Sequence, residues 1–188
     1  MQTFTLTFEQ LKALSLSMAK LDVRYYLNGV YLHTKDGKAM AVSTDGHRIL
    51  TVELKDNEVQ CDAKVLIQDN FVKDLLKLKL KQYFIVVTKD GDKTQWQCAH
   101  IKTECGLNNS NYPDYVRIMI TPEKDDMFAN TNFNCEYLVD ARNQKDLLES
   151  EKVKKFGCIL LKCKDVKSMG YYYNDEVGFK IGIMPQRM

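Results

Sequence analysis

One pattern constrains the fold most, because it recurs three times along the 188 residues: a strand, a helix and three further strands. In the first copy, alternation over residues 3–7 predicts a strand, and Thr7 with Gln10 forms a capping box that opens a helix. Leu11, Leu14 and Met18 share one face of that helix. Strands are predicted at 25–33, 38–44 and 47–54, separated by Asp-Gly turn signals.

The second and third copies keep the same order of elements. The second comprises a strand at 64–67, a helix at 70–81 and strands at 83–88, 93–100 and 102–107. The third comprises a strand at 127–132, a helix capped by Asn134, and strands at 157–163, 168–173 and 178–184. The repeat of about 50–60 residues predicts a modular α+β fold. The pattern alone leaves open a chance repetition of a common α+β arrangement, since the copies share little sequence.

Composition narrows the class of protein. Hydrophobic residues make up 45% and charged residues 28%, with a mean hydropathy of −0.36, which is typical of a globular chain. The net charge of +2 argues against a broad phosphate-binding surface. Apolar runs are too short to span a membrane, and residues 1–8 do not resemble a secretory signal, so we expect a cytoplasmic protein with free thiols.

Residues that could carry catalysis are scattered. His33, His47 and His100 lie far from one another in the sequence, no Cys lies beside a His, and no glycine-rich phosphate loop occurs. Asp125 and Asp126 lie in a polar connector, where a solvated surface role is expected. The sequence therefore predicts a protein that is not an enzyme and holds no metal or cofactor.

Four segments identify a family resemblance. They are Asp22–Gly29 (DVRYYLNG), Ser43–Ile49 (STDGHRI), Tyr112–Tyr115 (YPDY) and Met184–Met188 (MPQRM). In this order they resemble the middle domain and the carboxyl terminus of the bacterial replicative sliding clamp, the β subunit of the chromosomal DNA polymerase. Gln186 and Met188 depart from the residues usual at the clamp's tail, so partner specificity is expected to differ.

The resemblance implies a DNA-clamp fold in shortened form. Clamps of this family have three domains of two such repeats each, whereas this chain resembles the middle domain and the last half of the third. The implied division is a full clamp domain at 1–120, a connector at 121–131 and a half domain at 132–188.

The resemblance also implies which residues contact DNA. Arg24, Tyr25 and Tyr26 match positions at the inner rim of the clamp. Lys73, Lys77 and Lys81 have the i, i+4, i+8 spacing of one helix face. Because clamp helices line the central hole, the resemblance implies that this basic stripe contacts DNA. Without the resemblance, a solvated helix face would be the simpler interpretation.

Clamps also bind a short linear motif of their polymerase, loader and repair partners in an apolar pocket between the second and third domains. Apolar walls provide burial energy, while arginines orient the polar groups of the peptide. The matching positions here are Leu27, Thr44, Gly46, His47, Arg48, Ile49, Pro113, Ile118, Met184, Pro185 and Arg187.

The implied function is a DNA sliding clamp that encircles duplex DNA as a processivity factor, with a bacteriophage or other mobile element as the expected source given the short chain. The alternative is a non-encircling interaction module that competes at a host replication clamp. Clamp rings contain twelve repeats, so three per chain predict a homotetramer. Because the pocket takes residues from the first and third repeats, these should be neighbours, in the order second, first, third. The second and third repeats then lie at the two ends of the chain. The second repeat pairs with the second repeat of another chain, and the third repeat with the third repeat of another chain, which gives a dihedral ring.

Overall fold

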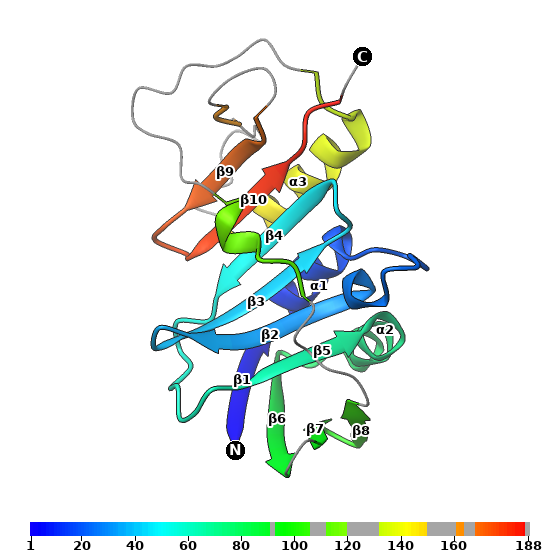
Figure 1. The fold of residues 1–188 in the computed structure, drawn as a ribbon, viewed down its shortest axis with the longest axis vertical. Coiled ribbons are helices and arrows are strands. Elements are labelled where there is room, and N and C mark those ends of the chain that lie inside the picture. Colours follow the sequence, from blue (N-terminus) through cyan, green and yellow to red (C-terminus); the bar gives the residue numbers. More distant parts are fainter. Residues whose placement is uncertain (91–92, 106–111, 120–131, 150–160, 164–167, 187–188) are drawn as a thin grey trace.

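The computed structural model describes residues 1–90, 93–105, 112–119, 132–149, 161–163 and 168–186. Figure 1 shows its elements along the chain. In order they are β1 (Gln2–Thr7), α1 (Phe8–Ser17), η1 (Tyr25–Leu27), β2 (Gly29–Lys35), β3 (Lys38–Thr44), β4 (Arg48–Glu53), β5 (Lys64–Gln68), α2 (Asp69–Leu78), β6 (Gln82–Asp90), β7 (Lys93–Cys98), β8 (Ile101–Cys105), η3 (Tyr115–Arg117), α3 (Cys135–Leu148), β9 (Gly170–Asn174) and β10 (Phe179–Ile183).

The first helix begins where the sequence predicts. The Thr7 hydroxyl accepts a hydrogen bond from the Gln10 backbone N–H at 3.2 Å, and the Gln10 side chain accepts one from the Thr7 N–H at 2.9 Å. Two otherwise unpaired amide groups are thereby satisfied, which fixes the direct passage from β1 into α1. Leu11, Leu14 and Met18 are buried, as their spacing predicts.

Two antiparallel sheets exchange strands between the first two repeats. The smaller sheet has the order β1-β6-β7-β8, so the first strand of repeat one belongs to the sheet of repeat two. The larger sheet has the order β5-β2-β3-β4-β10-β9, so the first strand of repeat two belongs to the sheet of repeat one. The pairing of β4 with β10 makes repeats one and three neighbours and confirms the predicted order second, first, third.

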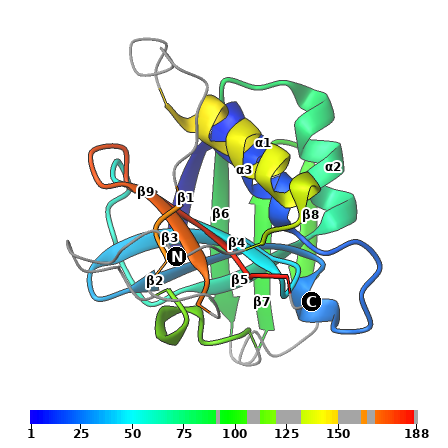
Figure 2. The ribbon, with the colours of Figure 1, turned by 90° about the horizontal axis from the view of Figure 1, so that it is seen from above.

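Helices α1, α2 and α3 lie on the same side of the six-stranded sheet (Figures 1 and 2). The Ser43 hydroxyl of β3 donates a hydrogen bond to the Leu14 carbonyl at 2.7 Å, which ties the sheet to α1. The Gln144 amide of α3 donates to the Ala13 carbonyl and to the Ser17 hydroxyl of α1, at 3.1 and 2.5 Å. One apolar core runs through all three repeats, from Phe4 to Ile183. The fold is therefore α+β, with a helical layer backed by sheet.

The structure corrects several predicted boundaries. Residues 25–27 form a 3₁₀ turn, not the start of a strand, because the Leu27 and Asn28 N–H groups bond back to Arg24 and Tyr25. The second helix ends at Leu78, not at residue 81, because Lys79 takes a left-handed conformation (φ 50°). The strand predicted at 93–100 ends at Cys98, where Ala99 turns the chain with φ 51°.

Parts of the third repeat lie outside the described residues, namely 127–131 of one predicted strand and 157–160 of another. Within the described part, Lys162 forms an isolated bridge to Tyr171 of β9. The connector predicted at 121–131 also lies outside the described residues, so the division into one and a half domains stays a prediction. None of the described helices is long and apolar enough to cross a membrane.

Candidate functional site

The junction between repeats one and three brings the turn between β3 and β4 beside the end of β10. Gly182 is paired with Ile49 and Ile183 with Arg48. The ladder then continues past the end of the strand, because the Met184 N–H donates to the His47 carbonyl at 2.7 Å. Two segments that are far apart in the sequence, and that both carry predicted partner-site residues, are therefore adjacent.

A third segment, residues 112–119, which we call the strap, crosses the face of the six-stranded sheet opposite the helices (Figures 1 and 2). Tyr115 is buried against Val42, Ile49 and Met169. The Tyr171 hydroxyl of β9 donates a hydrogen bond to the Ile118 carbonyl. The strap thus carries Pro113 and Ile118 across the junction.

Apolar side chains gather where the strap meets β4 and β10. A Cβ atom at Gly182 would lie 2.4 Å from Met169 Sδ, 3.0 Å from Ile49 Cγ2 and 3.2 Å from Met119 Sδ, so these three side chains converge over the glycine. The exposed apolar residues here include Val116, Ile118 and Met184. Sequence reasoning missed Met119, Val116, Met169 and Gly182, although their places beside the matched residues offered a signal.

The strap is anchored at its other end by aromatic residues. Tyr112 stacks on Tyr31 of β2, with ring centroids 4.2 Å apart, and the Tyr115 hydroxyl lies 2.8 Å from His33 Nε2. Burial lowers the pKa of His33 below 6.5 and raises the pKa of Tyr31 to about 12, so all of these rings are neutral at physiological pH. His33 is isolated in the sequence and becomes an anchor only through Tyr115, 82 residues later.

Arg48 is directed to the opposite, helical side of the sheet. Its Nε lies 3.0 Å from Asp45 Oδ2, its Nη1 pairs with Asp140 of α3, and its guanidinium lies 4.7 Å from the ring centroid of Tyr137. His47 stacks on the same Tyr137 ring at 6.2 Å. The predicted site is therefore split: Ile49 and the strap lie on one face, while Arg48 and His47 contact α3.

Thr44 and Gly46 shape the turn between β3 and β4. The Thr44 hydroxyl donates to the Arg48 carbonyl at 2.7 Å and accepts from the Gly46 N–H at 3.0 Å. Gly46 has φ 92°, a conformation that favours glycine. Leu27 is fully buried, which makes it a packing residue with no exposed surface for a partner. Arg187 lies outside the described residues, and Pro185 is half-buried beside Met184.

The predicted rim residues lie in and before η1. The Asp22 carboxylate binds Arg24 Nε at 3.0 Å and Nη2 at 2.7 Å, and this hydrogen bonding lowers the pKa of Asp22 to about 2. Tyr25 is exposed and meets Tyr26 edge-on, with ring centroids 5.7 Å apart. The tyrosines are thus presented at the surface, while the charge of Arg24 is balanced by its neighbour.

Two of the three lysines of the predicted basic stripe lie on α2. Lys73 pairs with Asp69 at 2.7 Å and Lys77 with Asp74 at 2.8 Å. Lys81 lies past the end of the helix, because α2 stops at Leu78, so its predicted place at i+8 is wrong.

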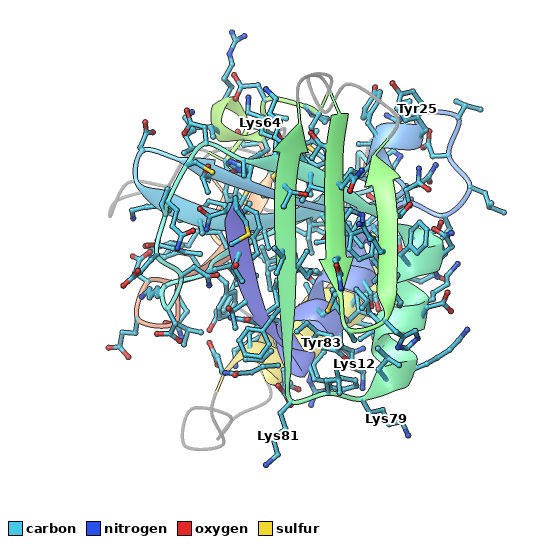
Figure 3. All side chains as sticks on the ribbon, turned by 90° about the horizontal axis from the view of Figure 1, so that it is seen from below. Lys12, Tyr25, Lys64, Lys79, Lys81 and Tyr83 are labelled. Carbon is cyan, nitrogen blue, oxygen red and sulfur yellow. The ribbon has the colours of Figure 1, made fainter. Side chains whose placement is uncertain are left out.

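Exposed lysines gather at the carboxyl end of α2. Figure 3 shows Lys79 and Lys81 together with Lys12 of α1 at one end of the molecule and Tyr25 toward the opposite end. The helix between these two ends is ten residues long, or about 15 Å. The predicted DNA contacts are therefore distributed along α2, with exposed lysines at its carboxyl end.

The sequence matches a known family model. The family model described as the DNA polymerase III beta subunit, central domain, matches residues 5–114. This range is more than half of the chain. The chain belongs to the DNA polymerase III beta subunit family.

Curated members of the beta subunit family match at moderate identity. The beta sliding clamp of Vibrio cholerae is 28% identical over 137 residues, which are 72% of this chain and 36% of that protein. The beta sliding clamp of Escherichia coli K12 is 26% identical over 152 residues, covering 76% of this chain and 38% of that protein. The chain therefore spans little more than a third of the length of these relatives.

Solved beta subunits share the fold over the whole chain. The sliding clamp from Bartonella birtlesii matches with a TM-score of 0.70 and 18% identity, over 100% of this chain and 66% of that one. The beta subunit from Pseudomonas aeruginosa matches with a TM-score of 0.69 and 19% identity, over 100% and 67%. At this identity the likeness establishes the fold alone.

Proposed function

We propose that the protein is a shortened DNA sliding clamp, a non-enzymatic processivity factor that encircles duplex DNA in the cytoplasm. Membership of the beta subunit family carries the proposal. It is supported by the layering of the chain, with three helices on one side and the sheets behind them, because clamps present helices to DNA and sheets to the outside. The DNA-facing surface is then that of α1, α2 and α3.

The charge of that surface suits a protein that slides. Lys73 and Lys77 are already paired with Asp69 and Asp74, so each contributes only part of its charge to a phosphate contact. Every fully engaged phosphate contact adds affinity that must be lost at each step along the DNA. Lys12, Lys79 and Lys81 are exposed and are the stronger candidates for transient contacts.

Partner peptides of the polymerase and clamp-loader type bind at the junction of repeats one and three. The apolar residues of the strap and of β10, with Ile118 and Met184 exposed, supply the surface for an apolar peptide end. Met119 and Met169 add side chains that adapt to different partners. Arg48 supports this surface from the other face of the sheet by holding α3, and Arg187 is the arginine proposed to orient the peptide.

The ring is built from four chains. Twelve repeats close a clamp, each chain supplies three, and the order second, first, third leaves the second and third repeats at the two ends. The contact that the second repeat lacks is of a different type from the one that the third repeat lacks. Each end of the chain therefore joins the same end of another chain across a two-fold axis, which gives a dihedral ring with partner sites on both faces.

Electron microscopy of the purified protein tests the proposal. Closed rings of four chains with two-fold symmetry and helices around the hole are the expected particles. Monomers, a head-to-tail ring or a trimer would refute this assembly, and a uniformly monomeric protein would favour a non-encircling module that competes at a host clamp.

A further inference from the structure

A buried pair of side chains joins β2 to the strap. The Tyr115 hydroxyl lies 2.8 Å from His33 Nε2, and only 9% of Tyr115 and 5% of His33 are exposed. The two polar atoms satisfy each other in a buried place, so removing one of them leaves the other without its partner. We call the pair of His33 and Tyr115 the latch.

We infer that the latch positions the partner site, so that His33 controls the binding of partner peptides from β2, which β3 separates from β4. His33 is a positioning residue, because it acts through Tyr115. The inference rests on the partner site proposed above and deepens it. It names the contact that holds the strap in place for binding, and it predicts that acid releases the strap.

Aromatic stacking fixes the ring of His33. Tyr31 stacks on His33 with ring centroids 5.1 Å apart, and it also stacks on Tyr112 at the start of the strap, at 4.2 Å. Tyr115 meets His33 edge-on, at 5.7 Å. Stacked rings therefore hold the first half of the strap to β2, and the bond of the latch fixes the Tyr115 ring beside them.

The backbone of Tyr115 connects the latch to the partner site. Its carbonyl accepts hydrogen bonds from the N–H groups of Ile118 and Met119, at 3.0 and 2.9 Å. The Ile118 side chain is exposed, and Met119 Sδ is one of the atoms that converge over Gly182 of β10. A displacement of Tyr115 would therefore move both side chains relative to β10.

The surroundings of the latch favour a neutral His33. Burial is the main cause that lowers the pKa of His33 below 6.5, and it outweighs a hydrogen bond with the Thr34 backbone. Met40, opposite His33 on β3, does not titrate. A protonated ring is better tolerated when the strap is released and the ring reaches water, so acid favours release. The charged or titratable groups around the latch are Lys35 of β2 and Lys64 of β5, which lower the pKa of His33 further, and Tyr31, Tyr112, Asp114 and Tyr115.

A buried hydrogen bond stabilises the fold wherever it lies, so a control must separate stability from positioning. The Ser43 hydroxyl donates to the Leu14 carbonyl at 2.7 Å and is buried on the face of the sheet that carries the helices. Ser43→Ala removes one buried hydrogen bond, as Tyr115→Phe does. It leaves the contacts of the strap in place.

The test measures two quantities near neutral pH: the calorimetric affinity for a short capped peptide whose last residues are Leu and Phe, and hydrogen exchange at the Ile118 and Met119 amides. His33→Phe and Tyr115→Phe should each weaken the peptide about tenfold and speed the exchange about tenfold, because a buried polar atom loses its partner. His33→Gln keeps a polar group near Tyr115 and should bind within about threefold of the wild type. Ser43→Ala should leave both quantities unchanged.

The pH profile is a readout that a purely structural role would not move. The peptide affinity of the wild type should fall below about pH 6.5, by up to about tenfold per pH unit, because the released strap binds the extra proton more readily. The affinity of His33→Gln should stay constant over the same range. His47 is present in both proteins, so the difference between the two profiles isolates His33.

The outcomes separate this inference from the partner site itself. A wild-type protein that does not bind the peptide would refute the partner site and, with it, this role of the latch. A wild-type protein that binds, with His33→Phe and Tyr115→Phe within about twofold of it, would keep the partner site and overturn the latch. Faster exchange at Ile118 and Met119 without a change in affinity would overturn the latch as well, as would equal pH profiles of the wild type and His33→Gln.

Discussion

Replacing Arg48 by methionine is expected to weaken the junction between repeats one and three. The guanidinium is directed at α3, bonds Asp45 and Asp140 and covers the Tyr137 ring, and only 12% of the Arg48 side chain is exposed. Methionine keeps the apolar stem and removes the charge. The carboxylates of Asp45 and Asp140 are then left without their partner.

The size of the effect follows from these contacts. A hydrogen bond to a charged group is worth about 1.5–3 kcal/mol, and a partly exposed cation–π contact about 0.5–1 kcal/mol. Because the carboxylates of Asp45 and Asp140 keep some access to water, at 17% and 29% exposure, we expect Arg48→Met to lower the free energy of unfolding by about 2–3 kcal/mol.

Urea denaturation at fixed protein concentration measures this change. For a domain of this size the slope is about 2 kcal/mol per molar urea, so the urea midpoint should fall by about 1–1.5 M. Lys38→Met is the matched control, because the pair of Lys38 with Glu53 is exposed and is worth less than about 1 kcal/mol. A double-mutant cycle of Arg48→Met with Asp140→Asn should show a coupling of about 1 kcal/mol or more.

The opposite outcome would contradict this reasoning. If Arg48→Met unfolds within about 0.5 kcal/mol of the wild type and yet abolishes peptide binding, the guanidinium contacts the partner. Arg48 would then belong to the peptide-binding face, as the sequence resemblance implies, and its contacts with α3 would be dispensable.

Three further predictions concern the strap, the partner site and the sheet. Met184→Ala should weaken a clamp-binding peptide of about 1 μM affinity (about −8 kcal/mol) by about tenfold in calorimetry, whereas Phe84→Ala, exposed on the smaller sheet, should not. Because burial lowers the pKa of His33 below 6.5, the unfolded chain binds more protons, so the free energy of unfolding should fall as pH drops below about 6.5. His33→Gln should reduce this slope, and an unchanged slope would exclude His33 as its source. Gly29→Ala should cost about 3 kcal/mol in thermal denaturation, because its Cβ would lie 2.2 Å from the backbone oxygen of Ile67, and a loss below about 1 kcal/mol would show that β2 and β5 separate easily.

Local patterns predicted much of the fold. The capping box at Thr7, the alternation in the strands and the Asp-Gly turns are interactions between near neighbours, and in the first two repeats the helices and strands they predict are present within the described residues. The element boundaries that were predicted wrongly depend on backbone hydrogen bonds and backbone conformation, which these patterns do not report. Residues 25–27 (Tyr-Tyr-Leu) have side chains typical of a strand, but backbone hydrogen bonds within the segment turn the chain. Helix α2 ends where Lys79 adopts a left-handed conformation, which a lysine does not predict.

Some of the predicted site residues become neighbours in the fold. The resemblance places His47, Ile49 and Met184 together, and the β4–β10 pairing brings them side by side. Alternation along β4 places Arg48 and Ile49 on opposite faces, but the partner of Arg48 was not predictable, because Asp140 lies 92 positions away in the sequence. The spacing of residue types in a sequence gives no information about contacts between residues that lie so far apart along the chain.

Retention on DNA circles tests the sliding clamp most directly. The protein, assembled on nicked circular duplex DNA, is challenged with salt concentrations that remove proteins bound by charge alone. A closed ring should remain on the circle and leave when a single cut makes the DNA linear, because it slides off an end. Equal loss from circular and linear DNA would contradict encirclement and leave a protein that binds clamp partners without holding DNA.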